Sequence, residues 1–227
     1  MIEDIIDIKC CNKLKGLTPV LKKWTQLVVK YSEHWPADPC YWYNERANIG
    51  VLAAAAWQYD HWISIEEYST KKIRKIPSNR RDGANFSGRC DLFLASKNGR
   101  SQFACEAKQA VQSISNEQIK DEFRLINIAA AAVWEDVSGL NSAEATHRVA
   151  LTICVPRISI ARSKAALNRD LVTEEVCRWL VCAKGIPAAE HGYAFVFPRR
   201  TRMLQDEGGK YIFPGVGILI RERLRSQ

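Results

Sequence analysis

Apolar residues recur at helical spacing near the start of the chain and again beyond residue 39. The first run covers residues 17–32, and one side of it consists of Leu17, Val20, Leu21, Trp24, Leu27 and Val28. This pattern is typical of an amphipathic helix. Asp38 followed by Pro39 is a helix-start signal, so a second helix is predicted from there to about Tyr59.

The middle of the chain changes to the alternating pattern of strands. Residues 62–68 alternate, with Ile63 and Ile65 on one side. Two more strands are predicted at 90–95 and 103–108, because a tight-turn sequence, Lys-Asn-Gly-Arg, separates them. The later elements are predicted as a helix at 116–137, a buried strand at 149–155, a helix at 174–183, and strands at 193–197 and 211–220. This order indicates an α/β fold with a mixed central sheet flanked by helices.

Length and composition fit a single compact unit. The chain has 227 residues, of which 47% are hydrophobic, so it is long and apolar enough to bury a core. No repeat, low-complexity segment or linker divides it, and residues 1–227 are interpreted as one domain. The formal net charge of +8 favours polyanionic partners such as nucleic acid.

The eight cysteines do not indicate a metal site. They contain no Cys-x-x-Cys pair, so a zinc ribbon or an iron–sulfur site is not expected. Their irregular spacing indicates free thiols in a reducing compartment. The acidic N-terminus is unlike a signal peptide, and the longest apolar run, residues 51–57, is too short to span a bilayer. We therefore expect a cytoplasmic protein with no membrane partner.

Two acids and a lysine occupy neighbouring places on the predicted hairpin. Asp91 lies near the start of its first strand, and Glu106 and Lys108 lie at the end of its second. Side chains alternate along a strand, so Glu106 and Lys108 point to the same side. Pairing about the turn brings Asp91 close to them. The sequence therefore predicts two carboxylates and one ammonium group at one end of a sheet.

Such a group suits the hydrolysis of phosphodiesters. Carboxylate oxygens are hard ligands that bind Mg²⁺ or Mn²⁺. The bound ion polarises a phosphodiester and lowers the pKa of its own water. A lysine beside the ion orients or deprotonates that water, or neutralises charge in the transition state.

This motif resembles that of the PD-(D/E)xK nuclease superfamily. It reads Asp91, then Glu106-Ala107-Lys108, and Cys90 stands at the position of the motif's proline. The resemblance implies that Asp91, Glu106 and the backbone carbonyl of Ala107 bind the metal ion. It also implies that Lys108 assists the attacking water.

The resemblance further implies a restriction-endonuclease-like fold. Its αβββαβ core corresponds to residues from about 39 to 155. The segment 1–37 is then an N-terminal helical extension, and 156–227 is a C-terminal α/β extension.

Many members of this superfamily take another glutamate from the helix before the strands, and Glu45 is the candidate for a catalytic and metal-binding role. The residues that follow it at helical spacing are apolar: Ile49, Leu52 and Ala56. Glu45 therefore heads the face that packs on the sheet. A carboxylate there is costly unless a metal ion or a cation accompanies it. A structural ion pair with Arg46 or Arg89 is the alternative.

Basic side chains gather ahead of Asp91. Residues 71–81 contain no acid and include a Pro-Ser-Asn turn signal, so they are predicted to form a loop or a hairpin tip. A run of charges is usually a solvated face, and phosphate contact is the functional alternative. The candidate nucleic-acid-binding residues are Lys71, Lys72, Arg74, Lys75, Arg80 and Arg81.

The leading hypothesis is a nuclease that uses Mg²⁺, or Mn²⁺, to hydrolyse DNA in a restriction- or phage-defence-type role. RNA is the second substrate to consider. A homodimer or a partner protein fits, since double-strand cleavage needs two sites. One alternative is a catalytically silent nuclease-fold subunit that binds nucleic acid or protein in a defence or counter-defence complex. Another is a structural α/β domain in which Glu106 and Lys108 form an exposed ion pair.

Overall fold

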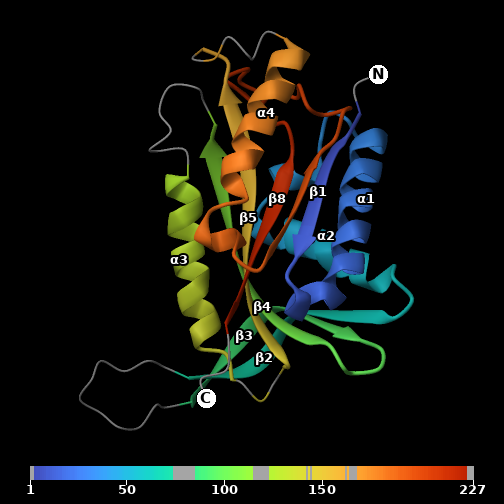
Figure 1. The fold of residues 1–227 in the computed structure, drawn as a ribbon, viewed down its shortest axis with the longest axis vertical. Helices are drawn as coiled ribbons and strands as arrows, with labels where there is room; N and C mark the ends of the chain where they lie inside the picture. Colours follow the sequence, from blue (N-terminus) through green and yellow to red (C-terminus); the bar gives the residue numbers. More distant parts are fainter. Residues whose placement is uncertain are drawn as a thin grey trace, which may run out of the picture.

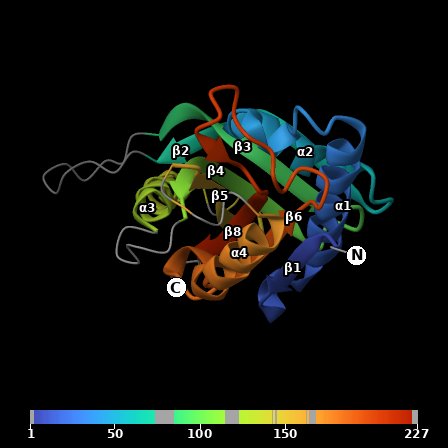
Figure 2. The ribbon, with the colours of Figure 1, turned by 90° about the horizontal axis from the view of Figure 1, so that it is seen from above.

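The computed structural model describes residues 3–73, 85–114, 123–141, 143, 145–161, 163 and 168–223. Eight strands form one curled sheet between two layers of helices (Figure 1). The helices α1 (Thr18–His34) and α2 (Glu45–Trp57) cover one face. The helices α3 (Arg124–Ser138) and α4 (Arg169–Ala183) cover the other, as the view from above shows (Figure 2). The predicted α/β class with a mixed sheet is confirmed.

Most strands are longer than predicted, and the strand predicted at 211–220 is divided into two. Their bounds are β1 (Ile5–Cys10), β2 (Trp62–Ile73), β3 (Asn85–Ser96), β4 (Gln102–Ser113), β5 (His147–Ser159), β6 (Gly192–Phe197), β7 (Tyr211–Ile212) and β8 (Val216–Arg223). Short 3-10 helices are η1 (Asn12–Leu17), η2 (Cys40–Trp42) and η5 (Pro187–Ala189). Both strands of the predicted hairpin are longer than expected, so Asp91 and Lys108 lie within strands rather than at their ends.

The strands lie in the order β1-β6-β8-β5-β4-β3-β2, and β7 pairs with the end of β5. The neighbours β4 and β5 are parallel, with Phe103 opposite His147 and Ser113 opposite Arg157. A parallel pair needs a crossover connection, and α3 lies in it. The other neighbours in this order are antiparallel. Because β8 pairs with β5 and β6 pairs with β8, the strands of the C-terminal extension belong to the same sheet.

The helix α2 packs on the sheet with its predicted apolar face, which buries Ile49, Leu52 and Ala56. Its cap differs from the prediction. The side chain of Asn44 accepts a hydrogen bond from the Ala47 backbone nitrogen at 3.1 Å, so Asn44 and not Asp38 begins the helix. The helix was predicted to start at Pro39. It starts later because Cys40–Trp42 form the separate 3-10 helix η2.

The N-terminal extension is only partly helical. The helix α1 confirms the amphipathic run, but the preceding residues form the edge strand β1, with Ile5 opposite Phe197 and Cys10 opposite Gly192. No strand was predicted here, and its partner β6 is distant in the sequence.

Two further expectations concern the thiols and the helices. All eight cysteines are free. Cys90, at the motif's proline position, is buried, and its thiol donates to the Cys105 carbonyl at 3.2 Å. None of the described helices is long and apolar enough to cross a membrane.

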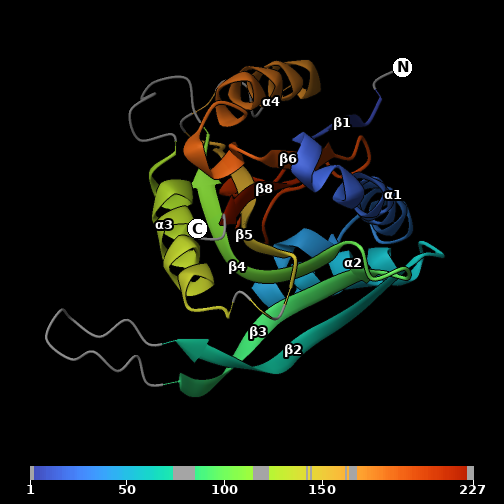
Figure 3. The same ribbon diagram turned by 60° about the horizontal axis from the view of Figure 1, so that its bottom comes forward.

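The strands β3 and β4 separate in the middle of the sheet. Their pairing extends from Ala95 opposite Gln102 to Leu92 opposite Cys105 and then ends. Beyond this point β3 continues with β2 as a two-stranded ribbon, while β4 continues beside β5 (Figure 3). We call this separation the fork. The next residue on each strand is Asp91 or Glu106, so the fork opens at the two acids of the motif.

Candidate active site

The carboxylate of Asp91 bridges the fork. Its Oδ2 atom accepts a hydrogen bond from the Ala107 backbone nitrogen at 2.8 Å. This contact takes the place of the strand pairing that ends one residue earlier. Asp91 is therefore held against the Glu106-Ala107-Lys108 segment, and the proximity predicted from the hairpin is present.

Glu106 is a buried acid with a nearby cation. Its side chain is 3% exposed, and its Oε1 atom lies 2.7 Å from the Nζ atom of Lys72. Burial raises the pKa of Glu106 to about 7, and the neighbouring charge of Asp91 contributes to the rise, while Lys72 opposes it. The Glu106 carboxyl therefore changes charge near neutral pH.

An interruption in the ribbon directs Lys72 to this acid. Glu67 has a left-handed backbone, with φ of 49°, and lies between the pairs Glu66–Leu92 and Tyr68–Cys90. The side chains change sides there: Leu92 joins the core beneath α1 and α2, whereas Cys90 packs with Ala104 on the other side. After the interruption, every second residue of β2, including Tyr68 and Lys72, therefore points to the side of Glu106.

Gly88 makes room for the Lys72 side chain. A Cβ atom at this position would lie 2.8 Å from Cδ and 2.9 Å from Cγ of Lys72. The stem of Lys72 therefore lies across the backbone of β3 on its way to Glu106. Lys72 was expected among the phosphate-binding residues, and the structure places it, with a side chain 16% exposed, against Glu106 instead of on the surface.

The other candidate phosphate-binding side chains lie outside the described residues. Arg74, Lys75, Arg80 and Arg81 lie outside the described residues, and Lys71 lies in β2 with its side chain outside them.

Lys108 is surrounded by acids from both helix layers. Its Nζ atom lies 3.3 Å from Asp136 Oδ2 on α3 and 3.9 Å from Glu45 Oε1 on α2, and it donates to the Ala107 carbonyl at 3.1 Å. Burial lowers the pKa of Lys108, but the charges of Glu45 and Asp136 outweigh burial and raise it above its usual value. Lys108 is therefore an ammonium ion at neutral pH. It is suited to orienting water or neutralising charge, and not to removing a proton.

Glu45 joins the same group from the first turn of α2. Its Oε2 atom accepts a hydrogen bond from the Gln109 backbone nitrogen at 3.1 Å. Burial raises its pKa, Lys108 opposes the rise and Asp91 adds to it. The structural alternative, an ion pair of Glu45 with Arg46 or Arg89, is not what is observed, because both arginines bind Glu67.

Gln109 fixes the position of α2 on β4. Its side-chain oxygen accepts from Asn48 Nδ2 at 2.9 Å, and its Nε2 donates to the Tyr43 carbonyl at 2.8 Å. These two bonds lock the start of the helix over the strand. Gln109 thus positions Glu45 next to Lys108.

Asp136 and the role of Lys72 were not predicted from the sequence. Asp136 lies three residues after Val133 and one before Val137, which are both buried residues of α3. A polar residue beside an apolar stripe is a detectable signal, because it lies at the edge of the packed face. The contact of Lys72 has no such signal, since it depends on the interruption at Glu67.

The described residues offer a limited set of metal ligands. Among them, no three histidine, cysteine, aspartate or glutamate side chains are grouped so that they could hold a metal ion. Mg²⁺ needs fewer, because proteins usually bind it through one or two carboxylates together with water and substrate oxygens. Asp91 and Glu106 fit this requirement: the charge of Asp91 raises the pKa of Glu106, and a divalent cation between them would offset that repulsion.

Replacing Lys72 with methionine tests the ion pair at Glu106. We expect Lys72→Met to lower the free energy of unfolding by about 1 kcal/mol at pH 8. Without Lys72 the buried Glu106 carboxylate has no cation beside it, so folding requires Glu106 to bind a proton. At pH 5 the loss should vanish, because Glu106 is already neutral there. Urea unfolding in EDTA at both pH values measures this, with Lys97→Met in the exposed β3–β4 turn as the control. An equal loss at pH 5 and pH 8 would contradict the pairing.

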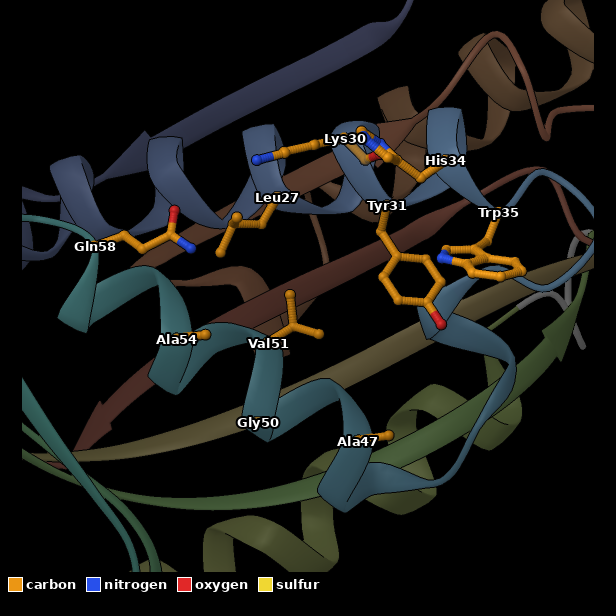
Figure 4. Close-up of a pocket in the computed structure, with 10 residues that line it drawn as sticks. All are labelled: Leu27, Lys30, Tyr31, His34, Trp35, Ala47, Gly50, Val51, Ala54 and Gln58. Atoms are coloured by element: carbon orange, nitrogen blue, oxygen red, sulfur yellow. The ribbon is translucent and has the colours of Figure 1, made fainter.

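A separate groove lies away from these residues. It runs between α1 and α2 and is lined on one side by Leu27 and Tyr31, with Trp35 at one end (Figure 4). On α2 it is bordered by Ala47 and Ala54, which lie on the side of the helix opposite the buried face that Glu45 heads. The groove is therefore not part of the fork.

Comparison of the chain with protein-family models, curated proteins and solved structures finds no match. A function for the fork must therefore be inferred from its own side chains and geometry.

Proposed function

We propose that the chain is a divalent-metal-dependent nuclease of the PD-(D/E)xK type that hydrolyses phosphodiester bonds in DNA. The observation that carries the proposal is the contact between the Asp91 carboxylate and the Ala107 backbone nitrogen. It holds one acid of the motif against the segment that contains Glu106 and Lys108. The contact forms where the two strands no longer pair, so it is made by the Asp91 side chain and not by the strand ladder.

The surrounding architecture supports the same proposal. Along the chain, α2, β2, β3, β4, α3 and β5 follow one another as a helix, three strands, a helix and a strand. This is the order of the αβββαβ core that the resemblance implies. Helix α2 supplies Glu45 to the fork, where a further glutamate was anticipated.

In the proposed reaction, Asp91 and Glu106 would hold Mg²⁺ or Mn²⁺, together with the Ala107 carbonyl. Such an ion supplies an activated water molecule and polarises the phosphodiester. Lys108, as an ammonium ion, would neutralise the negative charge that develops on the phosphate oxygens in the transition state. Glu45 and Asp136 keep the Lys108 amine in place from the two helix layers. Lys72 balances the charge of Glu106 in the metal-free protein.

One observation favours a second candidate function. Lys72 already occupies the side of Glu106 where a cation is needed, and a permanent ion pair there would prevent metal binding. In that case the chain is a catalytically silent nuclease-fold subunit that binds nucleic acid or protein. The two candidates differ in whether a divalent ion binds at the fork and displaces Lys72.

The purified protein should be incubated with linear DNA, supercoiled DNA and RNA in Mg²⁺, Mn²⁺ or EDTA. We expect cleavage of DNA with metal and none in EDTA, and a loss of about 100-fold in Lys108→Met. Lys97→Met removes an exposed lysine in the β3–β4 turn and should cleave at the wild-type rate. Cleavage that persists in EDTA, or that is unchanged in Lys108→Met, would overturn the proposed mechanism. Calorimetric titration with Mn²⁺ separates the silent alternative, for which no binding at the fork is expected.

A further inference from the structure

Two arginines share one carboxylate beside the fork. Arg46 Nη2 on α2 lies 2.9 Å from Glu67 Oε1, and Arg89 Nη1 on β3 lies 2.8 Å from Glu67 Oε2. Each guanidinium uses a different oxygen of Glu67, so both are held at the same time. Three separate elements, α2, β2 and β3, thus contribute one cluster, which we call the arginine pair.

The arginine pair lies next to the acids of the fork along every one of these elements. Arg46 directly follows Glu45, and Arg89 is two residues before Asp91. Glu67 lies between the residues that pair with Leu92 and Cys90, so it is opposite Asp91 on the ribbon. Along the chain, the arginine pair is therefore one or two residues from Glu45 and Asp91.

The arginine pair is open to solvent and carries excess positive charge. The side chains of Arg46 and Arg89 are 71% and 65% exposed, and that of Glu67 is 32% exposed. Two guanidinium groups against one carboxylate leave a net charge of +1. Each guanidinium has five N–H donors, and its contact with Glu67 uses only part of them.

Stability does not explain this cluster. Exposed ion pairs contribute little to folding, since water and salt screen them. Glu67 nevertheless has a left-handed backbone, with φ of 49°, which is unfavourable for a residue other than glycine. Backbone strain of this kind is concentrated at functional sites. The chain therefore keeps Glu67 in an unfavourable conformation at the place where it gathers two arginines.

We infer that Arg46 and Arg89, held together by Glu67, bind a backbone phosphate of a polynucleotide next to the phosphodiester at the fork. The inference rests on the proposed function and specifies how its substrate is held. Guanidinium groups match phosphate oxygens in a planar, two-pronged geometry. Contacts to phosphate fix the position of a strand and carry no sequence information. The site thus takes nucleic acids of any sequence and requires a phosphate beyond the scissile one.

The test measures binding without catalysis. Fluorescein-labelled DNA duplexes are titrated with protein in EDTA at several salt concentrations, and fluorescence anisotropy gives the Kd. We expect Arg46→Gln/Arg89→Gln to weaken binding about tenfold and to reduce the slope of log Kd against log salt by about one for each phosphate that is no longer neutralised. Arg100→Gln, an exposed arginine in the β3–β4 turn, loses one charge elsewhere and should change neither.

A second pair of variants separates charge from geometry. Arg46→Lys/Arg89→Lys keeps both charges but loses the two-pronged guanidinium, so the salt slope should return while the affinity stays below that of the wild type. Thermal unfolding shows whether each variant is folded, and the single Arg46→Gln and Arg89→Gln variants replace the double variant if it is not. The inference is overturned if Arg46→Gln/Arg89→Gln binds DNA with the same affinity and salt slope as Arg100→Gln. It is also overturned if the wild type does not bind DNA.

The outcome is independent of the cleavage assay. If the wild type cleaves DNA with Mg²⁺ and the glutamine variants bind as tightly as Arg100→Gln, the arginine pair is not the phosphate site and the nuclease proposal stands. If the glutamine variants lose affinity but the wild type cleaves nothing, the phosphate site stands and the nuclease proposal fails.

Discussion

Replacing Asp91 with asparagine should reduce Mg²⁺-dependent cleavage at least about 100-fold and leave the fold intact. The reason is that asparagine keeps the shape and the acceptor oxygen of the side chain. Its amide oxygen can still accept the hydrogen bond from the Ala107 backbone nitrogen, which Asp91 accepts at 2.8 Å. Only the negative charge is lost, and the proposed metal site needs that charge.

The matched control is Asp60→Asn, which removes an exposed aspartate in the turn between α2 and β2. Its cleavage rate should equal that of the wild type. Initial rates with a DNA substrate over a range of Mg²⁺ concentrations measure the effect, and circular dichroism verifies the fold. If Asp91→Asn cleaves at the wild-type rate, Asp91 does not bind the metal ion and the motif is structural.

Replacing Glu106 with glutamine should abolish metal-dependent cleavage and at the same time stabilise the metal-free protein by about 3 kcal/mol at pH 8. The pKa of Glu106 rises from 4.5 to about 7 in the folded protein. The folded state therefore holds the proton more tightly than the unfolded chain does. The wild type loses stability as pH rises from about 4.5 to 7, and a neutral glutamine avoids this loss.

Burial is the main cause of the raised pKa of Glu106, and the charged groups that face it modify the rise. Lys72 on β2 lowers its pKa, and Asp91 on β3 and Asp136 on α3 raise it. Urea unfolding of wild type and Glu106→Gln in EDTA should give a difference at pH 8 that disappears near pH 4. Adding Mg²⁺ should raise the Tm of the wild type and not that of the variant. A Glu106→Gln protein that is less stable than the wild type at both pH values would show that Glu106 is needed for folding.

The local parts of the site could be predicted from the sequence. Asp91, Glu106 and Lys108 were placed together because alternation along a strand and pairing about a short turn follow from adjacent residues. Glu45 was placed correctly because helical spacing put it at the head of a buried face. In both cases the geometry depends on positions a few residues apart.

The parts that depend on distant contacts could not be predicted. The contact of Lys72 with Glu106 requires the change of side at Glu67, and a left-handed glutamate has no signature in the sequence. In β2, alternation was visible, but Ile63 and Ile65 are 40% and 51% exposed because Trp62 and Ser64 face α2. Alternation shows that a strand has two sides and does not show which side a helix will cover.

The fork also divides the sheet into parts that should open independently. Beyond Asp91 the ribbon of β2 and β3 is bonded mostly within itself, whereas β4 beyond Glu106 lies beside β5 in the middle of the sheet. Two-stranded ribbons open more readily than strands inside a sheet. Backbone amide protons of the ribbon should therefore exchange with deuterium faster than those of β4 and β5. Because Asp91 and Glu106 belong to different parts, a cation shared between them would slow exchange throughout the ribbon, including amides far from the ion.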